Sequence, residues 1–348
     1  MRPRFLLAAA VSVLTSMIAA CSPQETAVSA EDFYKGRTVQ LLIGFGPTGG
    51  YDTYARTLAR HMGKHIPGNP TIVPQNMPGA GGLKVANYIY NVAPKDGTAF
   101  AIFARGIPME RLLGRTAGHQ FDATKFTWIG SITDEPSVCA FWHQSGIEGW
   151  EDMTAKTYKL GGSGVLTDLD IYSNVLHNMF HLKSRLISGF PGGSDVVLSM
   201  QRREVDGRCG WSWSSLYGLD RHMLDQKLLT IPVQLATEKI PELPDVPLVI
   251  DLTDDPKEKD ALRLIFSRQI MARPFAAPPG LSPDRVKVLR DAFDATMKDP
   301  AFLADMARQK LDVRPVPGQK LDELVREVYS YPADVVQIAA DAIKVPPR

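Results

Sequence analysis

Short apolar runs alternate with longer stretches of helical periodicity along most of the chain. The apolar runs predict strands at residues 39–45, 71–75, 99–103, 127–132, 138–142, 159–161, 185–188, 207–210, 229–234 and 270–275. Apolar residues at helical spacing predict helices at 51–65, 82–92, 168–180, 194–203, 257–269, 282–298, 300–308 and 319–343. Strands that alternate with helices are typical of parallel sheets with helices on both faces, so we predict an α/β fold.

Four glycine-rich turns each follow a predicted strand and precede a predicted helix, at 45–52, 78–82, 161–164 and 189–194. Backbone N–H groups at a helix N-terminus attract anions, and the helix dipole adds to this attraction. The turns form two pairs on either side of about residue 135. This recurrence predicts two similar α/β lobes whose turns face a shared cleft, a common place for ligands.

The first turn does not match the nucleotide-binding loops. Gly49 and Gly50 are followed by Tyr51 and Asp52, where a Walker loop has lysine and serine or threonine. The pattern G-x-G-x-x-G fits residues 44–49, but no acidic residue follows the second predicted strand. The turns therefore favour a small anionic ligand over a nucleotide.

The first 21 residues have the features of an export signal. Arg2 and Arg4 precede an apolar core at 5–20 that has the length of a signal peptide. The core ends in two alanines and Cys21, which resembles the lipobox of bacterial lipoproteins. An ordinary signal peptide with a chance cysteine is the alternative. We predict a lipoprotein signal peptide at 1–21, a tether at 22–32, and a periplasmic or extracytoplasmic protein held at the membrane by lipidated Cys21.

The composition argues against several classes of protein. The formal net charge is +1 and both signs are spread along the chain, so no nucleic-acid surface is expected. No later stretch has the length of a membrane span. Two further cysteines, Cys139 and Cys209, either pair in an oxidising compartment or stay as separate buried thiols, because spacing alone does not decide.

Catalytic and metal motifs are weak. Histidine pairs at 61/65 and 177/181 have the spacing of a zinc site, but no adjacent glutamate or clustered cysteine supports one. We interpret them as solvated histidines at helix ends, with no metal. Residues 161–164 come near a nucleophile elbow around Ser163, but Val165 stands where the last glycine is required. We therefore expect no catalytic residue, no enzyme activity and no cofactor.

Seven sequence strings then resemble one family, in that family's order. They are PTGGYDTYAR at 47–56, NMPGAGG at 76–82, APKDGT at 93–98, GFPG at 189–192, EVDG at 204–207, PPG at 278–280 and KDPAF at 298–302. Together they resemble the extracytoplasmic solute receptors of tripartite tricarboxylate transporters, the TctC-like or Bug receptor family. The resemblance covers about residues 33 to 345.

The resemblance implies a type II periplasmic-binding-protein fold of two α/β lobes. Lobe 1 is expected at 33–135 plus 270–348 and lobe 2 at 136–269, with crossing strands near 133–138 and 268–274. It also implies that a small carboxylate binds in the cleft and passes to membrane permease subunits. By position, ligand contacts are implied for Pro47, Thr48, Gly49, Gly50, Asp52, Gly79, Ala80, Gly81, Ser163, Gly164, Thr167, Gly192, Gly193 and Ser194.

Some points stay open at this stage. Arg105 follows a strand end and is a candidate for a second carboxylate or a surface arginine, and Trp211 and Trp213 form either a cleft wall or core. Thr48 adds a hydroxyl and a Cβ to a loop that the family usually builds as Pro-Gly-Gly. A ligand-sensing subunit and an enzyme that uses Ser163 are the alternatives to a transport receptor.

Overall fold

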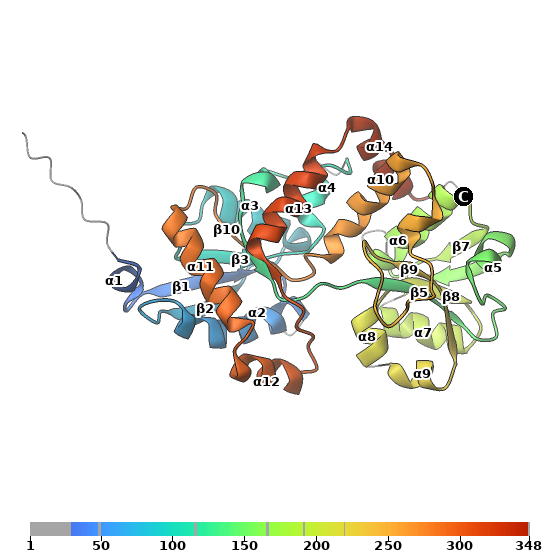
Figure 1. The fold of residues 1–348 in the computed structure, drawn as a ribbon, viewed down its shortest axis with the longest axis horizontal. Helices are drawn as coiled ribbons and strands as arrows, with labels where there is room; N and C mark the ends of the chain where they lie inside the picture. The colour runs from blue at the N-terminus through green and yellow to red at the C-terminus, as the bar shows by residue number, and fades with distance from the viewer. Residues whose placement is uncertain are drawn as a thin grey trace, which may run out of the picture.

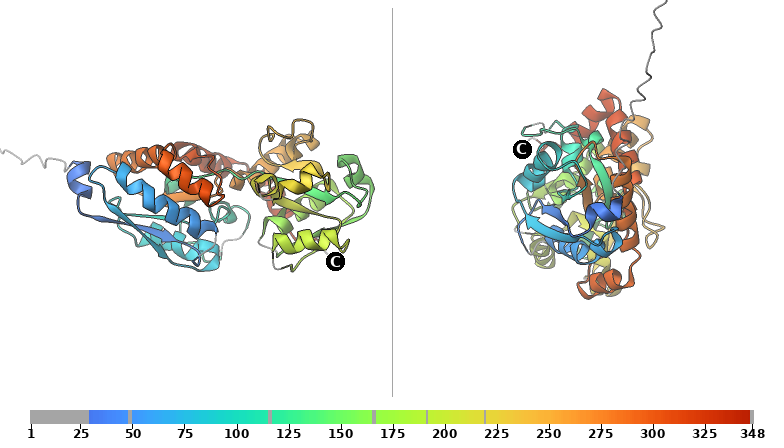
Figure 2. Two further views of the ribbon diagram at one scale, coloured as in Figure 1. Left: turned by 90° about the horizontal axis from the view of Figure 1, so that it is seen from below. Right: turned by 90° about the vertical axis from the view of Figure 1, so that its left-hand side faces the viewer.

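The computed structural model describes residues 29–47, 50–114, 117–164, 167–190, 192–218 and 220–346. Cys21, Thr48 and Gly49 lie outside these ranges. The chain forms two β-sheets, each with helices around it, and the two halves lie side by side (Figure 1). Figure 2 shows that the connections between the halves are narrow.

The first sheet has six strands in the order β11-β4-β10-β3-β1-β2. Their bounds are β1 Thr38–Ile43, β2 Thr71–Asn76, β3 Ala99–Ile102, β4 Thr127–Ser131, β10 Pro274–Ala277 and β11 Val316–Pro317. The helices of this half are α1 Ala30–Tyr34, α2 Gly50–Met62, α3 Leu83–Asn91, α4 Ile107–Glu110, α11 Pro283–Thr296, α12 Pro300–Arg308 and α13 Gly318–Ser330. Helix α1 begins inside the segment that the sequence suggested as a tether.

The second sheet has five strands in the order β7-β6-β8-β5-β9. Their bounds are β5 Ser137–Trp142, β6 Tyr158–Gly161, β7 Ser184–Ile187, β8 Gly207–Ser212 and β9 Leu229–Leu235. The helices of this half are α5 Trp150–Ala155, α6 Asp168–Phe180, α7 Gly193–Gln201, α8 Trp213–Gly218, α9 Arg221–Asp225 and α10 Pro256–Phe266. Short 3₁₀ helices occupy Gly63–His65, Ala80–Gly82, Ala123–Lys125, Val249–Leu252 and Ser267–Gln269.

The two sheets share one order of strands. In each sheet three neighbouring strands run parallel, β2-β1-β3 in the first and β7-β6-β8 in the second. The next strand runs antiparallel to its neighbours, and it is β10 in the first sheet and β5 in the second. Both sheets are therefore mixed, with the predicted parallel strands lying beside antiparallel ones. Both antiparallel strands follow a segment that arrives from the other half, and such a strand has no crossover helix to set a parallel direction.

Burial explains why the apolar runs became strands. All residues of β3 and β4 are buried, as expected for strands with helices on both faces. The helices bury one stripe each; in α13 that stripe includes Leu321, Val325 and Val328.

Two predicted elements are corrected. The helix expected at 319–343 is divided into α13 and α14 Ala333–Ala342, because Pro332 disfavours helical geometry at Tyr331, which is extended. The strand expected from residue 270 begins only at Pro274, since Ser267–Gln269 forms a 3₁₀ helix.

Two segments, 132–136 and 267–273, connect the halves and bind each other. The Glu135 N–H donates to the Gln269 carbonyl at 3.0 Å, and the Ile132 N–H donates to the Arg273 carbonyl at 3.3 Å. Farther along the chain, α14 packs on α10 and α6 and not on the six-stranded sheet. The C-terminal part of the chain thus adds a third link, and the lobe boundaries drawn from the sequence stay a prediction.

The open question about the cysteines is answered by the second sheet. Cys139 on β5 and Cys209 on β8 form a disulfide between two neighbouring antiparallel strands, and both residues are fully buried. The two cysteines are 70 residues apart in the sequence, so the bond closes a long loop. A disulfide of this kind fits an oxidising compartment.

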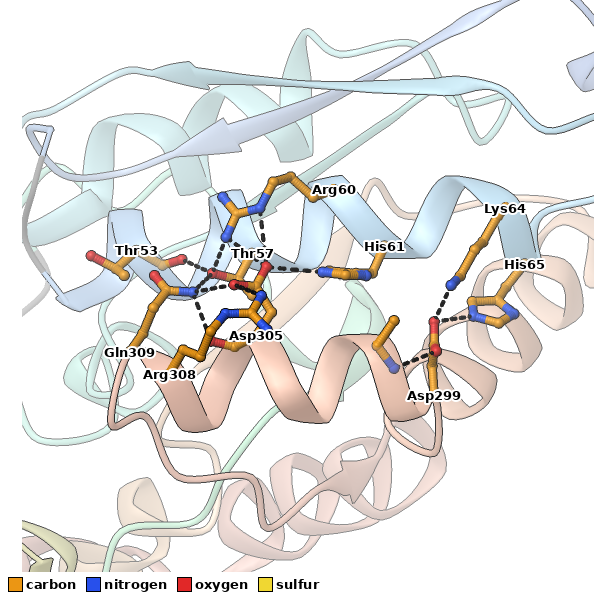
Figure 3. Close-up of polar contacts among 11 residues, drawn as sticks. Thr53, Thr57, Arg60, His61, Lys64, His65, Asp299, Asp305, Arg308 and Gln309 are labelled. Atoms are coloured by element: carbon orange, nitrogen blue, oxygen red, sulfur yellow. Dashed lines mark hydrogen bonds and ion pairs between the residues drawn. The ribbon is translucent and has the colours of Figure 1, made fainter.

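The histidines at 61 and 65 are not solvated helix ends, which corrects the sequence interpretation. His61 on α2 contacts the Asp305 carboxylate at 2.9 Å, and His65 contacts Asp299 at 3.1 Å, both from the α12 region (Figure 3). Arg60 also donates to Asp305, at 2.9 Å. The carboxylates tie α12 to α2, and no group of potential metal ligands was found among the described residues.

The contacts of Asp299 and Asp305 with α2, here called the α2–α12 seam, predict that the stability of the protein falls in acid. Hydrogen bonding from His61 and Arg60 lowers the pKa of Asp305 to about 2 although burial opposes it, and Lys64 and His65 hold the pKa of Asp299 below its ordinary value. A carboxyl whose pKa is lowered on folding stabilises the protein above its unfolded pKa of about 4, and this contribution is lost as pH falls toward 2.

We therefore expect the urea midpoint to fall between pH 4 and pH 2, and to fall less steeply in Asp305→Asn. Urea melts at several pH values test this. Asp291→Asn, an exposed carboxyl on α11, is the matched control and is expected to keep the wild-type slope. If the urea midpoint of Asp305→Asn falls with pH as steeply as that of the wild-type protein, the seam is not the cause of the acid sensitivity.

Candidate functional site

A cavity of about 700 Å³ lies where the two halves meet. The first half contributes α2, the Ala80 turn and the segment after β3. The connecting segments contribute three charged residues, and the second half contributes the first residue of α6. The lining includes Tyr51, Ala80, Leu83, Ala104, Arg105, Gly106, Ile107, Glu110, His119, Glu135, Asp168, Arg268 and Arg273.

Arg105 connects both halves across this cavity. Its backbone N–H donates to the Tyr51 hydroxyl at 3.1 Å, which fixes the segment after β3 against α2. Its guanidinium donates to Glu135 at 3.0 Å and to Asp168, at the start of α6. Planar guanidinium groups match carboxylates in geometry as well as charge. The structure therefore has an arginine between the halves that already holds carboxylates from the connection and from the second half.

Glu135 is ionised in this setting. Burial raises its pKa, but the guanidinium groups of Arg105 and Arg273 outweigh burial and hold the pKa of Glu135 below its ordinary value. Arg273 lies 4.7 Å from the ring centre of Tyr51 and 5.0 Å from that of Tyr54. These aromatic faces and Glu135 keep Arg273 beside the N-terminal end of α2.

The cavity is formally balanced in charge. Its three arginines, Arg105, Arg268 and Arg273, face three carboxylates, Glu110, Glu135 and Asp168. Glu110 is separate from the arginine group and lies 3.5 Å from His119. The Nε atoms of Arg268 and Arg273 are buried without a hydrogen-bond partner among the described residues. Arg268 and Arg273 both line the cavity, so their guanidinium groups add positive charge to its wall.

Gly106 allows this arrangement. A Cβ at that position would lie 1.6 Å from the Arg268 guanidinium. Any larger residue at position 106 would push Arg268 away from Asp168, which it approaches to 3.8 Å.

The loop between β6 and α6 is organised by Asp170, which is 1% exposed. Its carboxylate accepts from the Gly164 N–H at 3.0 Å and from the Ser188 hydroxyl. Ser163 donates to Thr167 at 3.1 Å, and Thr167 donates to the Gly164 carbonyl at 2.8 Å. Within the described part of the chain, the Ser163 hydroxyl thus donates to another hydroxyl and not to a histidine or a carboxylate. This pattern gives no support to a hydrolase mechanism.

Asp52 has a positioning role in the structure. Its carboxylate binds Arg56 at 2.9 Å and Asn76 at 2.7 Å, and Asn76 also donates to the Phe45 carbonyl at 2.9 Å. Asp52 thereby ties the first glycine turn to the end of β2. A direct contact of Asp52 with ligand stays a prediction.

A smaller cavity of about 320 Å³ lies at the carboxyl end of β8. Its lining includes Gly193, Ser194, Arg208, Trp211, Ser212, Ser215 and Asp220. Trp211 and Trp213 are both buried, so both belong to the core, and Trp211 also forms part of this cavity wall. The Ser212 side chain also helps to hold down the pKa of Glu135, which lines the larger cavity.

The sequence predicted part of this arrangement. Ala80 and Arg105 line the larger cavity, and Gly193 and Ser194 line the smaller one. Among the described residues, neither lining includes Pro47, Gly50, Gly79, Ser163, Gly164, Thr167 or Gly192. The ligand contacts of these residues and of Gly81 stay predictions. Glu135, Asp168, Arg268 and Arg273 were missed. Charged residues inside the expected crossing segments were the available signal for three of them.

Comparison with known proteins supports the fold inferred from the sequence. No family model matches the chain. Solved structures of TctC and Bug solute-binding proteins match it closely in fold, so the chain has a periplasmic-binding-protein fold, and the resemblance drawn from the sequence strings is confirmed at this level. A TctC solute-binding protein from Polaromonas is 17% identical with a TM-score of 0.67, and the match covers 87% of this chain and 99% of that one.

Two further structures are similar. MatC from Rhodopseudomonas palustris with bound malate is 19% identical with a TM-score of 0.56, over 86% of this chain and 99% of that one. An R. palustris protein with adipate is 17% identical with a TM-score of 0.58, over 87% and 97%. Among curated proteins, a UPF0065 protein from the tcbD-tcbE intergenic region of a Pseudomonas species is 22% identical over 249 residues, 69% of this chain and 70% of that protein.

Proposed function

We propose that this protein is an extracytoplasmic receptor that captures a small carboxylate between its two halves and delivers it to a tripartite tricarboxylate-type permease. The observation that carries the proposal is Arg105, which binds carboxylates of the connecting segment and of the second half inside a cavity that both halves line. Similar folds with bound malate and adipate support carboxylate as the ligand class.

The geometry suggests how ligand binding changes the protein. A ligand carboxylate at Arg105 takes the place of Asp168 and contacts residues of both halves. Ligand binding favours a closed state only if the ligand interacts better with that state, and contacts from both halves meet this condition. The permease then recognises the closed form.

The proposed location follows from the N-terminal segment and the fold. Export fits the buried disulfide, and lipidation at Cys21 holds the receptor at the membrane. No described helix meets the length and hydropathy needed to cross a membrane. Mass spectrometry of the mature N-terminus tests the anchor, and a mature chain that starts elsewhere and carries no lipid would contradict it.

A thermal-shift scan against small carboxylates tests the proposed function. For the chain truncated after Cys21, a ligand at 100 times its Kd is expected to add about 2.7 kcal/mol to the free energy of unfolding. We expect stabilisation by one class of carboxylate and none by the matching amides. If no acid stabilises the protein, and native mass spectrometry finds no ligand already bound, the proposal fails.

A further inference from the structure

A third cavity, of about 790 Å³, lies in the second half between α6 and β7, which are side by side in Figure 1. Its described lining has no residue in common with the two cavities above. Helix α6 forms one wall, the strand forms another, and two residues from the end of the chain complete it. The lining is Asp170, Ser173, Asn174, His177, Ser184, Arg185, Leu186, Ile187, Ser188, Val345 and Pro346, here called the α6–β7 groove.

The main chain of β7 is open toward this groove. β7 is an edge strand that pairs on one side with β6. The Gly162 N–H donates to the Ile187 carbonyl at 2.9 Å, and the Gly189 N–H donates to the Gly162 carbonyl at 3.1 Å. Main-chain groups alternate in direction along a strand, so those of Leu186 and Ser188 face away from β6. Outside the sheet pairing, no hydrogen bond from a described residue reaches the main chain of Leu186.

The other three sheet edges are protected. β11 has two residues, one of them Pro317. On β2, the N–H groups of Thr71 and Met77 face β1, so the intervening Pro74 stands at the free edge, where it offers no N–H. The edge at β9 is partly covered, since the Gln234 N–H donates to the Pro247 carbonyl at 2.9 Å. Exposed edges invite pairing with another chain, and β7 lacks these protections.

Asn174 gives a second, independent sign of an occupant. It lies on α6, is 3% exposed, and its side chain lines the groove. No hydrogen bond joins that side chain to another described residue. A buried amide without a partner is costly, and its one acceptor and two donors match those of a peptide group.

The charge that the groove leaves open is positive. The Asp170 carboxylate already accepts from the Gly164 N–H at 3.0 Å and from the Ser188 hydroxyl. Arg185 on β7 is exposed and forms no ion pair with a described carboxylate. Lys183, just before the strand, is exposed as well. A segment that lies along β7 is therefore favoured if it carries acidic side chains.

We propose that the α6–β7 groove binds an extended acidic segment of a partner protein, which adds a strand to the second sheet. Its main chain pairs with the free edge at Leu186 and Ser188, and one of its peptide groups binds the Asn174 amide. An acidic side chain of the segment meets Arg185. Strand addition of this kind takes affinity from the main chain and specificity from the side chains that line the groove. The proposal is independent of Arg105 and of the ligand between the halves.

Fluorescence polarisation with labelled, blocked hexapeptides tests the proposal on the full chain. The acidic probe alternates threonine and valine with two glutamates, the basic probe has lysines in place of the glutamates, and a third probe is the acidic one with alternate amides N-methylated. We expect the acidic probe to bind with a Kd below about 1 mM. The basic and N-methylated probes are expected to bind at least about tenfold more weakly, because each loses charge complementarity or several main-chain donors.

Two variants locate the binding. Leu186→Pro removes one N–H from the free edge and keeps the groups that pair with β6, so it is expected to weaken the acidic probe about tenfold. Leu186→Val keeps the N–H and is its matched control, expected to bind like the wild-type protein. Asn174→Leu removes the unpartnered amide, is expected to weaken the probe similarly, and decides the matter if Leu186→Pro does not fold.

Three results would overturn the proposal. The first is that no probe binds the wild-type protein with a Kd below about 1 mM. The second is that the acidic probe and its N-methylated form bind equally, since strand addition needs the main-chain donors. The third is wild-type affinity in a folded Asn174→Leu, as judged by circular dichroism, which would place the peptide outside the groove.

Discussion

Arg105→Met is expected to weaken binding of the carboxylate ligand by a factor of about 100 or more. Truncating one member of a buried, hydrogen-bonded charge pair costs about 2–5 kcal/mol of binding free energy. Arg105 is 14% exposed and is the arginine that contacts carboxylates from both the connection and the second half. Its loss removes the charge that a ligand carboxylate would meet.

Titration calorimetry of Arg105→Met measures this effect, with circular dichroism to show that the variant folds. Arg111→Met makes the same change at an exposed arginine after α4 and is expected to bind like the wild-type protein. Glu135 keeps Arg273 as a partner in the variant, at 3.4 Å, which limits the cost to folding. Wild-type affinity in a folded Arg105→Met would place the ligand elsewhere.

Replacing Cys139 and Cys209 by serine is expected to lower the free energy of unfolding by about 4 kcal/mol. The bond closes a loop with a sequence separation of 70 residues, and the entropy of the unfolded chain rises when a loop of that length is opened. A second loss of stability is local. Both positions are fully buried, so each serine hydroxyl is taken out of water, which is costly.

Urea denaturation of the double serine variant, and of the wild-type protein with and without reductant, measures the loss. Ser199→Ala, a buried serine on α7 that lies outside the disulfide, is the control for a small polar change and is expected to cost much less. A double variant as stable as the oxidised wild-type protein would contradict the structural role of the bond.

The strands and most helices could be predicted from the sequence because each apolar run or stripe is buried in the structure, as its pattern predicts. The bounds of α6 and α12 agree with the prediction. The errors occurred where a local signal was outweighed. The turn at Tyr331 and Pro332 interrupts a continuous apolar stripe. The antiparallel directions of β5 and β10 depend on which half the chain enters from, which no local pattern records.

The site was less predictable because its charged residues come from distant parts of the chain. Arg105 was a candidate on its position after a strand. Nothing in the sequence shows that Glu135 and Asp168 bind it, since these carboxylates are 30 and 63 residues away. The cysteine pair had the same difficulty, because only the register of β5 on β8 brings Cys139 and Cys209 together.

Hydrogen–deuterium exchange with and without the best ligand tests the central claim most directly, that a carboxylate binds between the halves and contacts both. We predict slower exchange in two separate regions, the backbone amides at 104–107 after β3 and those at 168–171 at the start of α6. Protection confined to one half, or found only away from both regions, would contradict the account.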